Sequence, residues 1–431
     1  MGIDVSAYST SLPKGRFFQL SSTNTLRKIE ESARAWAASQ GLGPLCTLDR
    51  PDPQSLDVYL TPIGDPVEFA IRENRITVAF RSSNLGPGFH AAVVEMLDRI
   101  ARDVQFTWAW TATDGEDLDE TGFARSRDYD ALQLAMLRFL GSLGRFAQAH
   151  YNRTESAPSF CLPLGLAGEV GNIACPLGFR PLRWGRDLGD LDDGGLRAEA
   201  EDFFVWWEPG LTGATWLRFL RAQLWQNALW RPAVTAEDVR VNAQIAHTLA
   251  RIRTLGAVLP ADLAAALEEH DRLKVHSRPP APTGIGYRKR LLYHQVTAAW
   301  RIGLPGYLTL VESADERMWQ QPDLLLELSA LLVQRKMSAE VPFEWPSSLE
   351  GPVRQTSRGL QYKLSARAWS DDGGSHQTAA LLSEQTDETR LLILTLSSAE
   401  DWPYAEFGAW VDSVVCAESG SVPSIKHAHL H

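Results

Sequence analysis

Cysteine is scarce in this 431-residue chain, and the four copies form neither a C-x-x-C pair nor a regular spread. Zinc ribbons and disulfide frameworks need such spacings, so the sequence indicates neither and is typical of a reducing compartment. No stretch approaches eighteen apolar residues, and the N-terminus lacks a charged segment followed by an apolar one. We therefore expect no membrane span and no secretion signal, and predict a cytoplasmic protein.

Recognisable catalytic motifs are also missing. The ten histidines form no H-E-x-x-H pair, and there is no G-x-S-x-G nucleophile turn. The glycine-rich stretch 165–171 has no convincing helix after it, so it predicts a loop and not a nucleotide site. His427, His429 and His431 lie at the C-terminus, and a terminus is a poor place for catalysis. These patterns call for no cofactor.

Positive charge is outweighed by negative charge. The 42 Lys and Arg residues face 53 Asp and Glu residues, which leaves a net charge of −11. Nonspecific binding to nucleic acid needs a basic surface that displaces counterions, so we expect no nucleic-acid partner. An acidic surface steers basic molecules, so a basic or neutral protein is the expected partner. The sequence leaves the oligomeric state open.

Tryptophan is abundant, with fifteen copies, several of them in close pairs. Large aromatic rings occur both in protein cores and as anchors of interfaces, because one ring hides much apolar surface while its N–H finds a partner. The interface candidates are Trp108, Trp110, Trp206 and Trp207. Burial in the core is the alternative for each of them.

Hydrophobic periodicity predicts an α+β protein in which two α+β domains flank a mainly helical one. Residues 1–152 are expected to form a small, mostly antiparallel sheet backed by helices. The clearest elements there are a hairpin with strands at 67–71 and 76–80, and helices at 26–39 and 128–149.

The middle domain, residues 153–282, begins with an irregular segment rich in proline and glycine, which is expected to contain only short strands and turns. A helical part and a proline-rich linker follow. The expected helices span about 212–230, 235–255 and 260–273.

The second α+β domain spans residues 283–431. Its leucine-rich stretch 322–336 predicts a helix, and residues 404–415 predict a closing helix. The sequence Asp-Asp-Gly-Gly at 371–374 favours positive φ, so it predicts a hairpin between the strand-like runs on either side, 361–369 and 377–383.

A Gly-Pro-Gly turn at residues 86–88 follows a strand-like run and opens an amphipathic helix. Free N–H groups at a helix N-terminus attract anions, and a histidine titrates near neutral pH. Gly86, Gly88 and His90 therefore predict an anion- or ligand-binding site. The alternative is a glycine-rich entry into a packed helix, because the turn lacks the Lys-Ser/Thr of a phosphate loop.

An acidic loop between residues 117 and 128 places oxygen-bearing side chains at the spacing of a calcium loop, with a glycine at its sixth position. The candidate ligands are Asp117, Asp119, Thr121 and Asp128. Two arginines lie inside the loop and a strand-like run precedes it, which favours a solvated acidic loop that caps the next helix. The sequence thus leaves open a calcium site and a solvated loop that caps the next helix.

The main functional hypothesis is a cytosolic, non-catalytic protein that binds another protein, of an immunity, inhibitor or regulatory type. One alternative is a hydrolase or transferase acting on a phosphorylated small molecule at the Gly86–His90 turn. A further alternative is a structural subunit of a bacterial assembly. Proximity of His90 to Asp117 or Asp119 would favour the enzyme, whereas a turn filled by Trp108 or Trp110 would argue against it.

Overall fold

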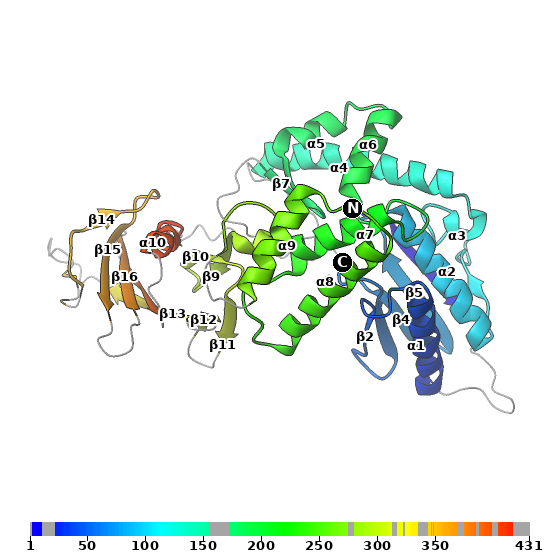
Figure 1. Cartoon of the computed structure of the whole chain (residues 1–431), viewed down its shortest axis with the longest axis horizontal. Helices are drawn as coiled ribbons and strands as arrows, with labels where there is room; N and C mark the ends of the chain where they lie inside the picture. Colours follow the sequence, from blue (N-terminus) through cyan, green and yellow to red (C-terminus); the bar gives the residue numbers. More distant parts are fainter. Residues whose placement is uncertain are drawn as a thin grey trace. The chain divides into compact units, whose positions relative to one another are not determined.

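A computed structural model of the chain (Figure 1) describes residues 2–10, 22–154, 172–274, 280–312, 317–321, 324–334, 344–345, 347, 349–368, 375–384, 388–398 and 404–416. The described part of the protein contains ten α-helices and several small sheets. Neighbouring strands of its sheets run antiparallel. The expected α+β class is confirmed.

The chain divides into two compact units. The first comprises Met1–Pro163, Val170–Ala228 and Glu237–Leu267, and the second Leu164–Glu169, Leu229–Ala236 and Glu268–His431. A six-stranded sheet and eight helices, α1 to α8, lie in the first unit. The division into three domains, with boundaries near residues 152 and 282, stays a prediction.

The sheet of the first unit has the strand order β2-β3-β4-β5-β1-β6. Its strands are β1 (Asp4–Ser9), β2 (Thr47–Asp49), β3 (Ser55–Tyr59), β4 (Val67–Arg72), β5 (Arg75–Arg81) and β6 (Trp108–Ala109). The hairpin expected at 67–80 is confirmed as β4–β5, and its two turn residues Glu73 and Asn74 both have positive φ, 49° and 59°. Such angles match the twist of a two-residue hairpin.

One face of this sheet is covered by α1 (Ser22–Ser39) and α2 (Pro87–Val104), which pack together (Figure 1). The strands alternate between buried and open positions, as a half-buried sheet requires. Val67, Phe69 and Ile71 of β4 point into the core, while the residues between them do not.

The first unit contains further helices, of which those near the predicted ranges 128–149, 212–230 and 235–255 follow the sequence predictions in outline. The further helices are α3 (Phe123–Ser126), α4 (Tyr129–Thr154), α5 (Leu182–Leu188), α6 (Asp193–Phe203), α7 (Gly213–Ala222), a π-helical turn (Gln223–Asn227) and α8 (Ala236–Thr254). The next helix, α9 (Ala261–Leu273), begins in the first unit and ends in the second.

The segment after residue 153, expected to be irregular, contains helices α5 and α6 besides the short hairpin of β7 (Asn172–Cys175) and β8 (Gly178–Pro181). The start of α6 is stabilised by the Asp192 side chain, which accepts a hydrogen bond of 2.8 Å from the Gly195 amide. Both helices pack on α4. These helices are too short for periodicity to reveal them, and tertiary packing stabilises them. The glycines of 165–171 lie outside the described residues.

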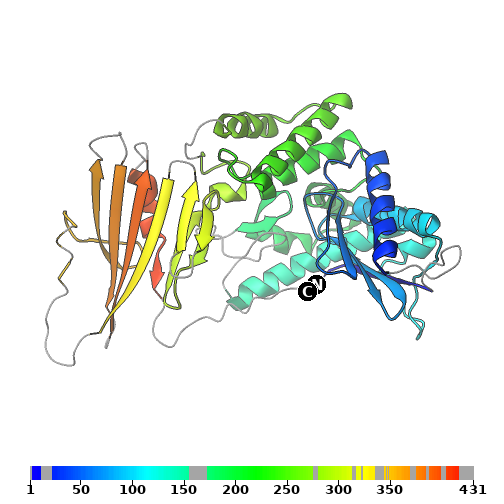
Figure 2. The same cartoon turned by 90° about the horizontal axis from the view of Figure 1, so that it is seen from below.

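The second unit contains a seven-stranded sheet of order β11-β12-β13-β17-β16-β15-β14, with strands seen side by side in Figure 2. These strands are β11 (Thr309–Glu312), β12 (Arg317–Gln321), β13 (Leu324–Gln334), β14 (Arg354–Gln355), β15 (Gln361–Ala368), β16 (Ser375–Glu384) and β17 (Glu388–Ser398). A smaller sheet combines β9 (Leu291–Gln295), β10 (Trp300–Pro305) and β18 (Val415–Cys416). A 3-10 turn, Tyr287–Lys289, precedes β9, and α10 (Tyr404–Asp412) contacts β10 and β16.

The predicted helix at 322–336 is wrong. The stretch forms β13, which pairs with β17 along its whole length. Leu324 and Leu326 point into the core while Glu327 is exposed. Leucine favours helices in isolation, but pairing with β17 along the whole strand and with β12 at its start overrides that preference. The predicted hairpin of β15 and β16 is confirmed, and its turn at 371–374 lies outside the described residues.

A buried cation links α9 to the start of β9 in the second unit. The Lys289 ammonium lies 2.7 Å from the Glu269 carboxylate and 4.4 Å from the centre of the Trp230 ring. Burial lowers the pKa of Lys289, and the contact with Glu269 opposes that shift.

Of the described helices, none is long and apolar enough to cross a lipid bilayer.

The pH dependence of stability should reveal Glu406 of α10. Burial raises its pKa from 4.5 to about 7. Between these two values the folded chain holds the proton more tightly than the unfolded chain, so the free energy of unfolding should fall as pH rises through this window. Because the side chain is partly exposed, we expect a loss of about 1 kcal/mol.

Urea unfolding of the wild type and of Glu406→Gln at several pH values measures this loss. The variant should lack the decline between pH 4.5 and 7. Glu327→Gln, at an exposed position of β13, is the matched control and should retain it. An identical pH profile in wild type and Glu406→Gln would contradict the assignment.

Candidate functional site

The glycine turn lies between β5 and α2, where the sequence placed it. Gly86 has φ of 106°, a conformation that side chains rarely adopt, and it caps the helix N-terminus. Both glycines also permit a close approach of the chain that follows α6. A Cβ on Gly86 would lie 2.7 Å from the Phe204 Cβ, and a Cβ on Gly88 would overlap the Trp206 ring and the Glu208 carbonyl.

This approach closes the turn. The Gly88 amide donates to the Trp206 carbonyl at 2.9 Å, and the Trp206 amide donates to the Leu85 carbonyl at 2.7 Å. The Trp206 ring also packs edge-on against Phe89. The Gly88 N–H group, which could otherwise bind an anion, is therefore already hydrogen-bonded within the protein, and apolar side chains fill the space in front of it. The turn is filled by Trp206 and Phe204, not by Trp108 or Trp110.

His90 does lie close to Asp119, as the enzyme hypothesis requires. The His90 Nε2 atom is 3.3 Å from Asp119 Oδ2, and its Nδ1 atom is 3.0 Å from Ser82 Oγ. The network is complete when the Ser82 hydroxyl donates to Nδ1 and the Nε2–H donates to Asp119. A serine, a histidine and an aspartate are thus linked in one chain of hydrogen bonds.

Asp119 is held by backbone and side-chain donors. Its Oδ2 also accepts from the Ala124 amide at 2.7 Å, and its Oδ1 accepts from the amide and the hydroxyl of Thr121 at 2.9 and 2.7 Å. Burial alone raises the pKa of this carboxyl, but the hydrogen bonds and the charge interaction with His90 outweigh burial and hold the pKa well below its usual range. Asp119 is therefore ionised at neutral pH.

This chain has the residue types of a hydrolase triad but not its accessibility. Ser82 and His90 are 0% exposed and Asp119 is 1% exposed. In serine hydrolases the serine contacts Nε2 and the aspartate contacts Nδ1, which is the reverse of the order here. A buried serine cannot meet a substrate, so the geometry favours a structural connection between β5, α2 and the acidic loop.

The four candidate calcium ligands of the acidic loop are engaged in hydrogen bonds and ion pairs within the protein, and Thr121 donates to Asp119. Both oxygens of Asp119 are engaged as described, Asp117 lies 3.3 Å from Arg125, and Asp128 accepts a hydrogen bond of 3.0 Å from the Ala131 amide at the start of α4. Across the described ranges, no three His, Cys, Asp or Glu side chains gather as metal ligands. Calcium binding stays a prediction, and this geometry favours the helix-capping alternative.

Three of the four candidate interface tryptophans are core residues. Trp108, Trp206 and Trp207 are at most 7% exposed. The Trp108 N–H donates to the Leu97 carbonyl at 2.9 Å, and the Trp206 N–H donates to the Gly210 carbonyl at 3.3 Å. Only Trp110 of the four is half-exposed. The alternative of core burial therefore fits these three rings better than a role at an interface.

The open face of the six-stranded sheet is a second candidate site. It is the face opposite α1 and α2, and its side chains are exposed or half-exposed. On β1, β3, β4 and β5 they are Ser6, Tyr8, Ser55, Asp57, Tyr59, Glu68, Ala70, Arg72, Arg75, Thr77 and Ala79. Polar, aromatic and very small side chains alternate here with the core residues.

An acidic row crosses three strands of this face. Asp49 lies directly opposite Asp57, and Asp57 lies directly opposite Glu68. None of the three carboxylates pairs with a cation within the described part of the chain. Burial raises the pKa of Asp57, and the charges of Glu68 and Asp49 raise it further. Like charges in direct cross-strand contact are destabilising, so this acidic row costs stability.

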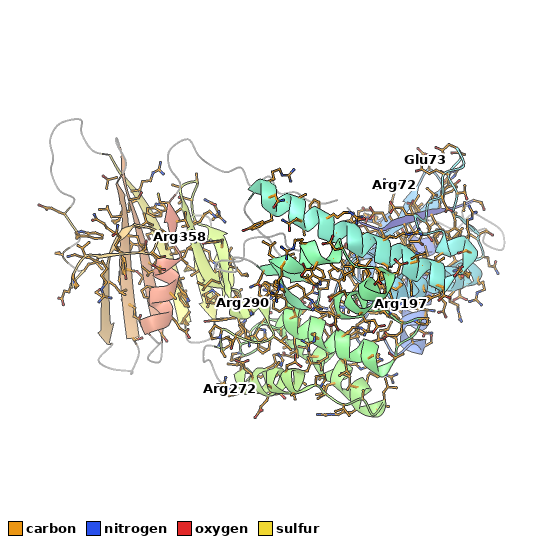
Figure 3. All side chains as sticks on the ribbon, turned by 90° about the horizontal axis from the view of Figure 1, so that it is seen from above. Arg72, Glu73, Arg197, Arg272, Arg290 and Arg358 are labelled. Carbon is orange, nitrogen blue, oxygen red and sulfur yellow. The ribbon has the colours of Figure 1, made fainter. Side chains whose placement is uncertain are left out.

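A hollow of about 480 Å³ lies beside the acidic row on the same face. Its floor consists of small side chains, among them Ser6, Ala70 and Ala79. Arg72 and Arg75 stand at one end, directly opposite each other in the β4–β5 ladder. Arg72 lies next to Glu73 of the hairpin turn (Figure 3). The carboxylate of Glu68 lines the hollow as well.

The open face was not predicted from the sequence. The signal was present, because the period of two that predicted the hairpin also places Glu68, Arg72 and Arg75 on the side away from the core. The sequence pattern does not reveal which strands are neighbours. The order of β3, β4, β5 and β1 in the sheet decides which charged side chains lie next to each other. Ser82 was missed for a related reason, because its partner His90 is 8 residues away and Asp119, which His90 contacts in turn, is a further 29 residues along the chain.

Replacement of His90 tests the structural interpretation of the buried chain. His90→Ala removes the partner of the buried Ser82 hydroxyl and one of the hydrogen bonds of the ionised Asp119, and it leaves a cavity in the core, so we expect a loss of about 3 kcal/mol in the free energy of unfolding. His150→Ala, at a half-exposed position of α4, is the control and should cost less than about 0.5 kcal/mol. Chemical denaturation measures both. A His90→Ala variant as stable as the wild type would point to a functional histidine.

Replacement of Asp57 tests the repulsion within the acidic row. Asp57→Asn removes one of three mutually repelling charges, so it should raise the free energy of unfolding by about 0.5 kcal/mol at neutral pH. The gain should shrink as salt screens the row and as low pH protonates it. Denaturation of wild type and variant at low and high salt decides the point. A destabilised Asp57→Asn variant would show that the row is not under repulsion.

Comparisons with known proteins were made by sequence and by structure. No protein-family model matches the sequence, and no curated protein matches it. Among solved structures, a protein from Bacteroides thetaiotaomicron with a crystal structure at 1.50 Å resolution is 7% identical, over 28% of this chain and 46% of the other chain, with a TM-score of 0.22. A similarity at this level carries no argument, so function must be argued from the chemistry of the chain itself.

Proposed function

We propose that this protein is a non-catalytic binding protein that engages a basic protein partner through the open face of the six-stranded sheet. The proposal is carried by the accessibility of this face and by its three adjacent carboxylates, to which the described residues supply no cation. A partner that supplies lysine or arginine side chains over Asp49, Asp57 and Glu68 would convert a repulsive contact into a favourable one.

The composition of this face suits protein recognition. Tyr59 lies on the same strand as Asp57, two residues along and therefore on the same side. A tyrosine offers a large apolar contact together with a polar end, as interface anchors commonly do. Burial and the charges of Asp57 and Asp49 raise the pKa of Tyr59, so it remains an uncharged phenol at neutral pH.

The other candidate functions have less support. A hydrolase or transferase at the Gly86–His90 turn would need substrate to reach His90, which is 0% exposed. A structural subunit of an assembly would also use an exposed surface, but the described residues contain no repeated surface feature that favours this function. An inhibitor or immunity protein fits the acidic face best, because such proteins cover basic functional surfaces of their targets.

A capture experiment with matched variants tests the proposal. The full chain is immobilised and exposed to native lysate of the source organism, in parallel with Asp57→Asn/Glu68→Gln and with Glu95→Gln/Glu201→Gln. The control pair removes the same charge from exposed positions of α2 and α6. We expect one stoichiometric partner with a basic surface, retained by the wild type and the control and about tenfold weaker with the sheet variant.

The salt dependence provides a second readout. Affinity for that partner should fall as salt rises, and the fall should be shallower for Asp57→Asn/Glu68→Gln than for the control. Equal capture by both variants would overturn the assignment of the surface. A partner whose binding is indifferent to salt, or turnover of a substrate by the purified chain, would overturn the proposal itself.

A further inference from the structure

The hollow on the open sheet face has features that binding of a protein by the acidic row does not explain. It is bounded by small side chains below, by two arginines at one end and by the segment 112–118 along one side. Its volume of about 480 Å³ lies within the range of small-molecule sites. The acidic row explains neither the two arginines nor the absence of large side chains from the floor.

Arg72 and Arg75 place two like charges on neighbouring strands. They form the last pair of the β4–β5 ladder, directly opposite each other. Neither makes an ion pair with any residue in the described ranges, although the chain carries an excess of 11 negative charges. Guanidinium groups on neighbouring strands can both donate to one carboxylate or phosphate group, and binding such an anion would offset their like charges.

Tyr8 holds one of these arginines against the sheet. The Arg75 guanidinium carbon lies 5.4 Å from the centre of the Tyr8 ring, a cation–π distance. The Tyr8 hydroxyl in turn donates to the Thr111 carbonyl at 3.1 Å. Stacking on an aromatic ring reduces the freedom that the guanidinium would lose on binding a ligand, so this contact pre-organises the charged end of the hollow.

The side wall is pre-formed as well. The Ser6 amide of β1 donates to the Leu118 carbonyl at 2.8 Å, and the Leu118 amide donates to the Trp110 carbonyl at 2.9 Å. These backbone hydrogen bonds hold the segment 112–118 beside β1. Leu118 and Ala112 thereby give the hollow an apolar wall next to its floor of alanine, serine and threonine.

We propose that this hollow binds a small organic anion, a carboxylate or a phosphate monoester with a flat apolar body. Arg72 and Arg75 take the anionic group, and the apolar body lies along Ala70 and Ala79 against Leu118. The inference goes beyond protein binding by the acidic row and does not depend on it.

Calorimetry with three simple probes tests the site on the full chain. Phenyl phosphate and benzoate carry the two kinds of anionic group on the same flat body, and benzyl alcohol is the neutral counterpart. We expect measurable binding of at least one anion and none of benzyl alcohol, and the stronger of the two anions identifies the preferred group. Inorganic phosphate alone should bind more weakly than phenyl phosphate, because it lacks the apolar body.

Two variants assign the binding to the hollow. Arg72→Gln/Arg75→Gln should weaken the preferred anion at least about tenfold. Ala79→Leu fills the floor and should weaken it comparably, with both arginines intact. Arg138→Gln/Arg253→Gln removes the same charge from exposed helical positions and should leave affinity unchanged. Circular dichroism confirms that each variant is folded.

Binding that persists in Arg72→Gln/Arg75→Gln or in Ala79→Leu would overturn the proposal. Equal binding of benzyl alcohol, or no binding of either anion to the wild type, would overturn it too. None of these results bears on capture of a protein partner, which is tested through Asp57 and Glu68. The two proposals can therefore fail separately.

Discussion

The first unit depends on the close packing of residues 204–208 against the glycine turn that begins α2. Two glycines leave no room for anything between the turn and the Phe204 and Trp206 side chains. Two backbone hydrogen bonds, from Gly88 to Trp206 and from Trp206 to Leu85, fix the contact. This contact joins chain segments more than a hundred residues apart, and it seals the helix N-terminus that would otherwise attract an anion.

Burial then decides which chemistry is accessible. Ser82, His90 and Asp119 have the residue types and the hydrogen bonds of a catalytic chain, but they are buried, and the rings of Phe80 and Phe123 pack edge-on against His90. In the core such a network serves mainly to satisfy polar groups and to connect elements, because an unpaired buried charge is costly. The presence of a triad-like arrangement is therefore no argument for catalysis without a route for substrate.

On the open face of the six-stranded sheet, by contrast, the charged groups can be reached from solvent. Its charges are accessible but arranged against stability, since Asp57 faces two other carboxylates and Arg72 faces Arg75. Natural proteins retain such unfavourable contacts where function requires them, and binding can relieve the repulsion. The same physical reason therefore supports both proposals for this face: a basic partner for the acidic row and a small anion for the arginine pair.

The sequence by itself determined the elements whose signals are local. The hairpin β4–β5, the start of α2 at its glycine turn and the pairing of β15 with β16 follow from turn residues and from the period of side chains along the chain. The α+β class followed from the same signals. Only the tertiary structure decided that residues 324–334 form a strand, because pairing with β17 overrides the helical preference of leucine. Likewise, only the tertiary structure enclosed His90 and brought Asp49, Asp57 and Glu68 into one row, because burial and cross-strand contact depend on segments that are distant in sequence.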